Sequence, residues 1–167
     1  MLTNKEAELT KNSYYEASVQ RPAAHPALTE RVQADVCVVG GGYAGLSAAL
    51  ELAQRGMRVV LLEARQLGWG ASGRNGGQAI VGYASDDAIE TQLGAPEAKT
   101  AWLMSCEAIN LLRQRIEQHH IDCDFVPGYM SLAVNAKKAA QLQQWGEHIE
   151  RQYQYKMHEV AHQEIGQ

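Results

Sequence analysis

The sequence has no long apolar run, no excess of basic residues and few cysteines, and each of these absences excludes a class of protein. No stretch of the 167 residues approaches the apolar length that a bilayer-spanning helix needs. The first residues, MLTNKEAELTKNSYYEAS, hold no hydrophobic segment of a secretory signal. The net charge of −4 and the pI near 5.8 do not indicate a nucleic-acid-binding surface. We therefore predict a cytoplasmic protein with no transmembrane segment and no nucleic-acid partner.

The three cysteines, Cys37, Cys106 and Cys123, are scattered and odd in number. Buried free thiols in a reducing compartment explain this pattern better than a disulfide framework. The chain is 46% hydrophobic and 20% charged, which is ordinary for a globular protein. Its length is sufficient for one domain with a core.

A metal site is not predicted, although histidine, cysteine and aspartate gather at residues 119–124. The adjacent His119 and His120 point apart, and with Asp122, Cys123 and Asp124 they match no strong ligand spacing. Histidines at a helix end, beside the negative end of the helix dipole, are the better interpretation.

The central feature is the stretch 36–63, VCVVGGGYAGLSAALELAQRGMRVVLLE. It begins with the apolar run Val36–Val39 and turns on a G-x-G-x-x-G pattern. It ends in a second apolar run, Val59–Leu62, followed by Glu63. Between the runs, residues recur at the spacing of one buried helix face: Leu46, Ala49, Leu50 and Ala53. Gly56 is placed to end that helix. The order of strand, turn, helix, strand and acid is the βαβ fingerprint for a dinucleotide.

Each residue of the turn has a chemical reason. Gly40 permits the sharp turn out of the strand, Gly42 lets the backbone approach a pyrophosphate, and Gly45 allows the helix to pack closely on the strands. The helix begins near Tyr43 and Ala44, where unpaired N–H groups and the positive end of the dipole favour that pyrophosphate.

Glu63 lies 18 residues after Gly45, where its carboxylate can accept both hydroxyls of an adenosine ribose. The same charge would repel a 2′-phosphate, which argues against NADP. The pattern alone leaves FAD and NAD open. It also leaves open a glycine-rich turn in another kind of α/β protein.

A second glycine-rich segment follows, with six glycines between residues 68 and 82. It comes after the ribose acid, so it is expected at the sheet edge where ligands of open α/β sheets bind. Ser72 is a candidate cap for a short helical turn, and Arg74, Asn75 and Gln78 add hydrogen-bond donors. The alternative is a mobile surface loop.

In the rest of the chain we predict an N-terminal arm over 1–33 with one short helical piece, and further helices and strands after the glycine-rich segment. Asp86 or Asp87 is predicted to cap a helix through Leu93, and Pro96 fits the first turn of a longer helix. That longer helix carries an apolar stripe of Trp102, Cys106, Ile109, Leu112 and Ile116.

Beyond a break at Pro127-Gly128, a strand is predicted over Tyr129–Val134. Asn135 is predicted to cap a further helix, and another strand is expected at 157–160. In that helix one face is shared by Leu142, Trp145, Ile149 and Tyr153.

The stretch DVCVVGGGYAGLSAALELAQRGMRVVLLEA followed by GWGASGRNGGQ resembles the FAD-dependent D-amino-acid oxidase and glycine oxidase (DAO) family. SYYEAS and IDCDFVPGYM are most similar to its gamma-glutamylputrescine oxidase branch. The glycine loop is the more specific part, and it favours FAD over NAD. The resemblance covers the chain from Ser13 onward but less than half of a typical family member, so we expect an incomplete N-terminal part.

The resemblance implies an α/β fold with a Rossmann-like FAD-binding βαβ unit and the beginning of a second, mixed α+β substrate domain. It divides the chain into an arm (1–33), the N-terminal part of the FAD-binding domain (34–120) and a truncated start of the substrate domain (121–167). Carried over by motif, Ser72–Gln78 would run beside the pyrophosphate and toward the flavin ring. The implied cofactor-binding residues are Gly40, Gly42, Tyr43, Ala44, Gly45, Glu63, Ala64, Ser72, Gly73, Arg74, Asn75, Gly76, Gly77 and Gln78.

The implied activity is oxidation of the C–N bond of an amine or amino acid by hydride transfer to flavin. Oxygen is the usual acceptor in the family, and a respiratory acceptor stays open. The branch suggests gamma-glutamylputrescine and polyamine catabolism; sarcosine, glycine and D-amino acids stay open as substrates. The sequence identifies no catalytic base, no substrate-binding residue and no oligomeric state. The alternatives are an NAD-dependent Rossmann dehydrogenase and an inactive, truncated nucleotide-binding protein.

Overall fold

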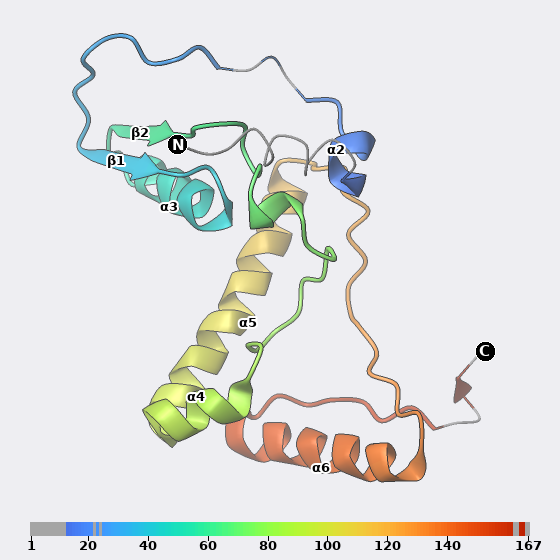
Figure 1. The fold of residues 1–167 in the computed structure, drawn as a ribbon. Coiled ribbons are helices and arrows are strands. Elements are labelled where there is room, and N and C mark those ends of the chain that lie inside the picture. The colour runs from blue at the N-terminus through green and yellow to red at the C-terminus, as the bar shows by residue number, and fades with distance from the viewer. Residues whose placement is uncertain (1–12, 22, 24, 162–163, 166–167) are drawn as a thin grey trace. The chain divides into compact units, whose positions relative to one another are not determined.

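The fold is that of a computed structural model, which describes residues 13–21, 23, 25–161 and 164–165. The chain divides after Gln78 into two compact units, each described by itself. The first unit contains helix α2 (Tyr14–Ser18), strand β1 (Val36–Val39), helix α3 (Tyr43–Gln54), strand β2 (Val59–Leu62) and the 3-10 turn η1 (Ala71–Gly73) (Figure 1). The second contains helices α4 (Asp86–Leu93), α5 (Ala95–Gln118) and α6 (Ala136–Tyr153).

Strands β1 and β2 have the bounds that the two apolar runs predict, and they pair in parallel. The register places Val36 opposite Val59 and Val39 opposite Leu62. Helix α3 connects the strands and packs on both of them, so the predicted βαβ unit is confirmed (Figure 1).

Gly56 ends α3 as predicted, with a φ of +84° that a residue with a side chain rarely adopts. The predicted burial of the helix stripe is wrong. No residue of α3 is fully buried, and Leu46 and Leu50 are each 37% exposed. The small sheet explains why: burial alternates along β1, so only one face of that strand meets the helix, and two strands of 4 residues each offer α3 little surface to pack against.

The other face of the strand pair is open. Val39 is 83% exposed, Leu62 is 37% exposed, and Cys37 is exposed beside them. The three cysteines are free, but the expected burial is wrong for Cys37 and Cys123, which are both exposed. Only Cys106 is partly covered, and burial raises the pKa of its thiol.

The arm contains the predicted short helix, α2. The Oγ of Ser13 caps it by accepting a hydrogen bond from the N–H of Glu16 at 3.1 Å. The part of the predicted arm before Ser13 lies outside the described residues.

The second unit confirms the three predicted helices, with one correction. The N-cap position of α4 is held by Ser85, so Asp86 begins the helix instead of capping it. Pro96 lies in the first turn of α5, and the Oδ1 of Asn135 accepts from the N–H of Lys138 at 2.9 Å to cap α6.

A small aromatic core joins α5 to α6. Trp102 is 2% exposed, Ile149 is fully buried, and the rings of Trp102 and Tyr153 stack at 4.6 Å between centroids. The stripes predicted on α5 and α6 thus meet, but only around Trp102. Farther along α5, Leu112 is 39% exposed.

Two predicted strands are wrong. Residues 129–134 and 157–160 have no strand assignment, although Gly128 does break the chain before the first of them, with a φ of +96°. A strand exists only through hydrogen bonds to a neighbour, and β1 and β2 are the paired strands of the described chain.

The predicted domain boundaries at residues 33 and 120 are those of the family's domains. The division into two compact units after Gln78 does not test them, so they stay a prediction. Within the described residues, no helix combines the length and the apolar character that crossing a membrane requires.

Replacing glycine by alanine should change the free energy of unfolding in opposite directions at two helical positions. A Cβ at Gly146 of α6 would meet nothing within 4 Å, so Gly146→Ala should raise the free energy of unfolding by about 0.5–1 kcal/mol. A Cβ at Gly45 of α3 would lie 1.9 Å from the Gly40 carbonyl oxygen, so Gly45→Ala should lower it by about 1–3 kcal/mol. Urea denaturation followed by far-UV circular dichroism measures both, and effects of the same sign would contradict the packing described.

Candidate functional site

The turn from β1 into α3 is built for close backbone approach. Gly40 has a φ of +104°, and its N–H extends the strand ladder to the carbonyl of Leu62 at 2.8 Å. Gly45 lies so close to the Gly40 carbonyl that a Cβ would stand 1.9 Å from its oxygen. Both positions therefore require glycine, for the conformation at Gly40 and for the space at Gly45.

The first turn of α3 offers N–H groups to a ligand. Gly42 is the N-cap and has no side chain to use them. Among the described residues, the N–H of Tyr43 donates to Ser72 at 3.0 Å, and none accepts from the N–H groups of Gly42, Ala44 or Gly45. These groups and the positive end of the helix dipole form a site suited to an anion.

Ser72 reaches this turn from far along the chain. Its Oγ accepts the Tyr43 N–H and would lie 2.9 Å from a Cβ at Gly42. The prediction that Ser72 caps its own helical turn is wrong, because Gly70 holds the N-cap of η1. The side chain instead caps α3.

Glu63 closes the other side of the turn. Its Oε2 accepts from the Gly41 N–H at 2.6 Å, and its Oε1 accepts from the Arg65 N–H at 2.9 Å. These hydrogen bonds, the Gly41 one first, hold the pKa of the Glu63 carboxyl below its usual 4.5, with a further contribution from the backbone of Ala64. The carboxylate is therefore ionised at neutral pH. Each oxygen keeps a lone pair for another donor, such as a ribose hydroxyl.

The glycine loop is folded by its own hydrogen bonds. The Nδ2 of Asn75 donates to the carbonyls of Ala71 and Ser72, and at 3.5 Å to the hydroxyl of Tyr43. Its Oδ1 accepts the Gly77 N–H at 2.9 Å. A Cβ at Gly73 would lie 2.3 Å from the Gly68 carbonyl oxygen. These contacts favour an ordered loop over the alternative of a mobile surface loop.

The structure brings most of the predicted residues together within the first unit. Contacts join Ser72 to Gly42 and Tyr43, and join Asn75 to Tyr43 and Gly77. Two other predicted residues have no such contact with the turn. The Arg74 guanidinium lies 5.8 Å from the ring centroid of Trp69, and a Cβ at Gly76 would meet nothing within 4 Å. Gln78 is exposed at the end of the unit.

Sequence reasoning assigned no role to Gly41, Arg65 or Trp69. Gly41 donates to Glu63 and accepts from the Gly68 N–H, and the Arg65 guanidinium is 5.8 Å from the Trp69 ring centroid. A signal existed only for Gly41, as the middle glycine of the run 40–42.

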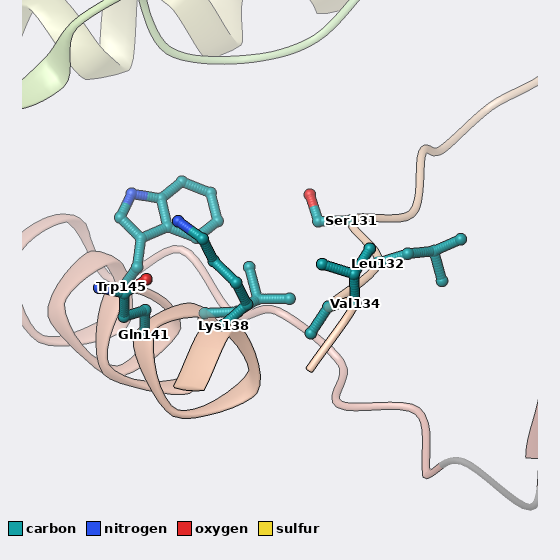
Figure 2. Close-up of a pocket in the computed structure, with 8 residues that line it drawn as sticks. Ser131, Leu132, Val134, Lys138, Gln141 and Trp145 are labelled. Carbon is teal, nitrogen blue, oxygen red and sulfur yellow. The ribbon is translucent and has the colours of Figure 1, made fainter. Parts of the chain in front are cut away.

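A separate shallow groove of about 470 Å³ lies in the second unit. Figure 2 shows Lys138, Gln141 and Trp145 on α6 along one side of it, and Ser131, Leu132 and Val134 on an extended segment along the other. Most of these side chains are exposed, and the lining contains no carboxylate. The groove therefore does not enclose a ligand. The described residues also hold no cluster of three His, Cys, Asp or Glu side chains suited to a metal ion.

Comparison with known proteins decides the family. The model of the DAO family, described as FAD dependent oxidoreductase, matches residues 35–165. The chain belongs to this family.

Among curated proteins, the DAO-family chain is 47% identical over 141 residues to gamma-glutamylputrescine oxidoreductase of Escherichia coli, a match that covers 84% of this chain and 33% of the relative. It is 46% identical over 127 residues to the probable oxidoreductase OrdL of Haemophilus influenzae, covering 75% and 30%. It is also 30% identical over 121 residues to a putative Rieske iron-sulfur protein of Bacillus subtilis, covering 72% and 24%. The chain thus spans about a third of the length of the first two relatives. No solved structure gives a significant match.

FAD is the cofactor of the family, and the family implies a Rossmann-like FAD-binding fold, of which the parallel βαβ unit is a part. The geometry fits the adenosine diphosphate half of FAD. Gly42 contributes no side chain at the start of α3, and the N–H groups there that have no acceptor suit a pyrophosphate. Glu63, on the other side of the turn, is an ionised acceptor for ribose hydroxyls.

The lowered pKa of Glu63 predicts a pH-dependent contribution to stability. Folding favours the ionised carboxyl, so the contribution is complete above about pH 4.5 and is lost as pH falls through the folded-state pKa. Glu63→Gln should therefore lower the free energy of unfolding at pH 7 by about 1 kcal/mol. The difference should shrink below pH 4.5.

Urea denaturation at a series of pH values between 7 and 3 measures this difference. The matched control is Glu51→Gln, which removes an exposed ion pair to Arg55 on α3 and should cost no more than about 0.5 kcal/mol. A constant difference between wild type and Glu63→Gln across the whole range would show that the carboxylate does not stabilise the turn.

Proposed function

We propose that this chain supplies the nucleotide-binding part of an FAD-dependent amine oxidoreductase. The observation that carries the proposal is the ionised Glu63 carboxylate beside the N-terminus of α3, where Gly42 contributes no side chain. In this arrangement Glu63 would accept the ribose hydroxyls of the adenosine, and the N–H groups of Gly42, Ala44 and Gly45 would face the pyrophosphate. Gly40 and Gly45 would act by allowing the turn itself.

The loop from Ser72 to Gln78 is proposed to run beside the pyrophosphate toward the flavin ring. Its support is the Ser72–Tyr43 hydrogen bond, which holds the loop at the start of α3. Gly73, Gly76 and Gly77 would let the backbone come close to the cofactor, and Arg74 and Asn75 would add donors.

When bound, FAD supplies the hydride acceptor for oxidation of a C–N bond. We propose a small-molecule amine as substrate, with gamma-glutamylputrescine as the first candidate because the Escherichia coli relative is named for it. Oxygen is proposed as the electron acceptor and polyamine catabolism as the process. We assign a catalytic role to none of the described residues.

We further propose the domain division of the family: an arm over 1–33, the FAD-binding part over 34–120 and the start of a mixed substrate domain over 121–167. The exposed face of the strand pair supports the proposal that further structure packs on it, since parallel sheets are ordinarily covered on both faces. An NAD-dependent dehydrogenase is not favoured, because the family is FAD-dependent.

Substitutions in the turn should weaken FAD binding. Glu63→Gln replaces a charged acceptor with a neutral one and should cost about 1.5–3 kcal/mol, or roughly ten- to a hundredfold in affinity. Gly42→Val would place a branched side chain against Ser72 and the pyrophosphate position, and should abolish binding. Titration of FAD against the purified chain, followed by flavin fluorescence, measures both, with Glu51→Gln as the control. An unchanged dissociation constant in Glu63→Gln would remove Glu63 from the site.

Residues 1–167 alone are predicted to bind FAD without oxidising amines. The reason is that the described residues leave an apolar surface open, with Val39 83% exposed, and include no group identified as orienting an amine beside a flavin. Peroxide formation and dye reduction with a panel of amines, recorded beside a thermal melt, test this. A cooperative melt with amine-dependent turnover would mean that these residues form a complete site. Failure to bind FAD at all would favour the inactive nucleotide-binding alternative.

A further inference from the structure

The N-terminal arm contacts the glycine loop near the end of that loop. Tyr15 projects from α2, and its hydroxyl oxygen would stand 2.4 Å from a Cβ at Gly77. Gly77 also has a φ of +71°. The loop backbone therefore has glycine where the tyrosine hydroxyl approaches it, and a Cβ at this position would require the Tyr15 side chain to move.

The same arm contacts the beginning of the loop. The Nη1 of Arg21 donates to the carbonyl of Leu67 at 2.9 Å. The guanidinium is oriented by Glu16 of α2, which accepts from its Nε at 2.8 Å and pairs with its Nη2 at 2.7 Å. Because Glu16 neutralises Arg21, this side chain is suited to holding the loop rather than to binding a phosphate.

Each end of the loop that the arm contacts is also connected to the turn 41–43. At the first end, the Leu67 side chain would lie 2.6 Å from a Cβ at Gly41, and the next residue, Gly68, donates to the Gly41 carbonyl at 2.8 Å. At the other end, Gly77 donates to Asn75, and Asn75 donates to the carbonyl of Ser72, whose Oγ caps α3.

We propose that the arm Ser13–Arg21 is a positioning element of the cofactor site, which holds the loop 67–77 against the turn 41–43 through Tyr15 and Arg21. The inference rests on the proposed function, in that the loop and the turn are taken to bind FAD. Tyr15 and Arg21 act through the loop and do not touch the cofactor. The arm thereby increases the fraction of chains whose loop is ready to receive FAD.

Hydrogen–deuterium exchange of the complete 167-residue chain tests the proposal, with and without FAD. Without FAD, Tyr15→Ala and Arg21→Gln should each increase exchange in peptides covering 67–78 by about three- to tenfold, which corresponds to losing one net hydrogen bond or contact. With FAD, the double variant should need about three- to tenfold more FAD for half-maximal protection of the turn 40–45.

One matched substitution serves as the control. Arg55→Gln removes an arginine that pairs with Glu51 on α3, away from the loop. It should change neither exchange in the loop nor the FAD requirement.

The outcomes separate the arm from the cofactor. Unchanged loop exchange in both arm variants would overturn the proposal, because the arm would then not hold the loop. Faster loop exchange with an unchanged FAD requirement would overturn it as well. The arm would then pack on the loop without affecting cofactor binding. Absence of FAD protection in the wild-type chain would instead refute the proposed cofactor binding, whatever the arm does to the loop.

Discussion

The first unit depends on one close approach, between the start of α3 and the carbonyl of Gly40. Because Gly45 has no side chain, the helix can lie where a Cβ would stand 1.9 Å from the Gly40 oxygen. The carbonyl ends of β1 and β2 and the N-terminus of α3 thus meet at one edge. Glu63, the residue after β2, can then reach the Gly41 N–H at 2.6 Å. An ionised acceptor and the positive end of a helix dipole come to stand on either side of one turn, which is the basis of the proposed FAD site.

The glycine loop is ordered by partners outside itself. Glycines make a loop flexible, and the entropy lost on ordering them must be offset by contacts. Here Ser72 supplies one by capping α3, Asn75 supplies several within the loop, and Tyr15 and Arg21 add contacts from the arm. The loop conformation that is proposed to face the cofactor is therefore a property of three segments of the chain together. The loop sequence GASGRNGGQ is only one of these.

The second unit contrasts with the first because a stacked aromatic pair, not a ligand site, organises it. Trp102 and Tyr153 stack and form a buried cluster with Ile149. Glu90 of α4 accepts hydrogen bonds from Tyr153 and, at 2.9 Å, from His148 of α6. This cluster joins three helices, yet most of the lining of the groove on α6 stays exposed. The apolar faces that remain open on both units are the physical reason for proposing that further structure completes the substrate side.

The sequence by itself determined the elements whose signals are local. The two apolar runs were sufficient to place both strands to the residue, and Gly56, Pro96 and Asn135 were sufficient to place helix ends. Only the tertiary structure decided the features that need a partner. Residues 129–134 have the composition of a strand, but no segment that the structure describes pairs with them. Leu46 and Leu50 have helical spacing but little to pack against. Ser72 capping α3 across 29 residues, and Tyr15 lying on Gly77, leave no periodic trace in the sequence. Spacing along the chain reports local geometry, whereas burial, capping from a distance and the closing of a site depend on which segments meet in space.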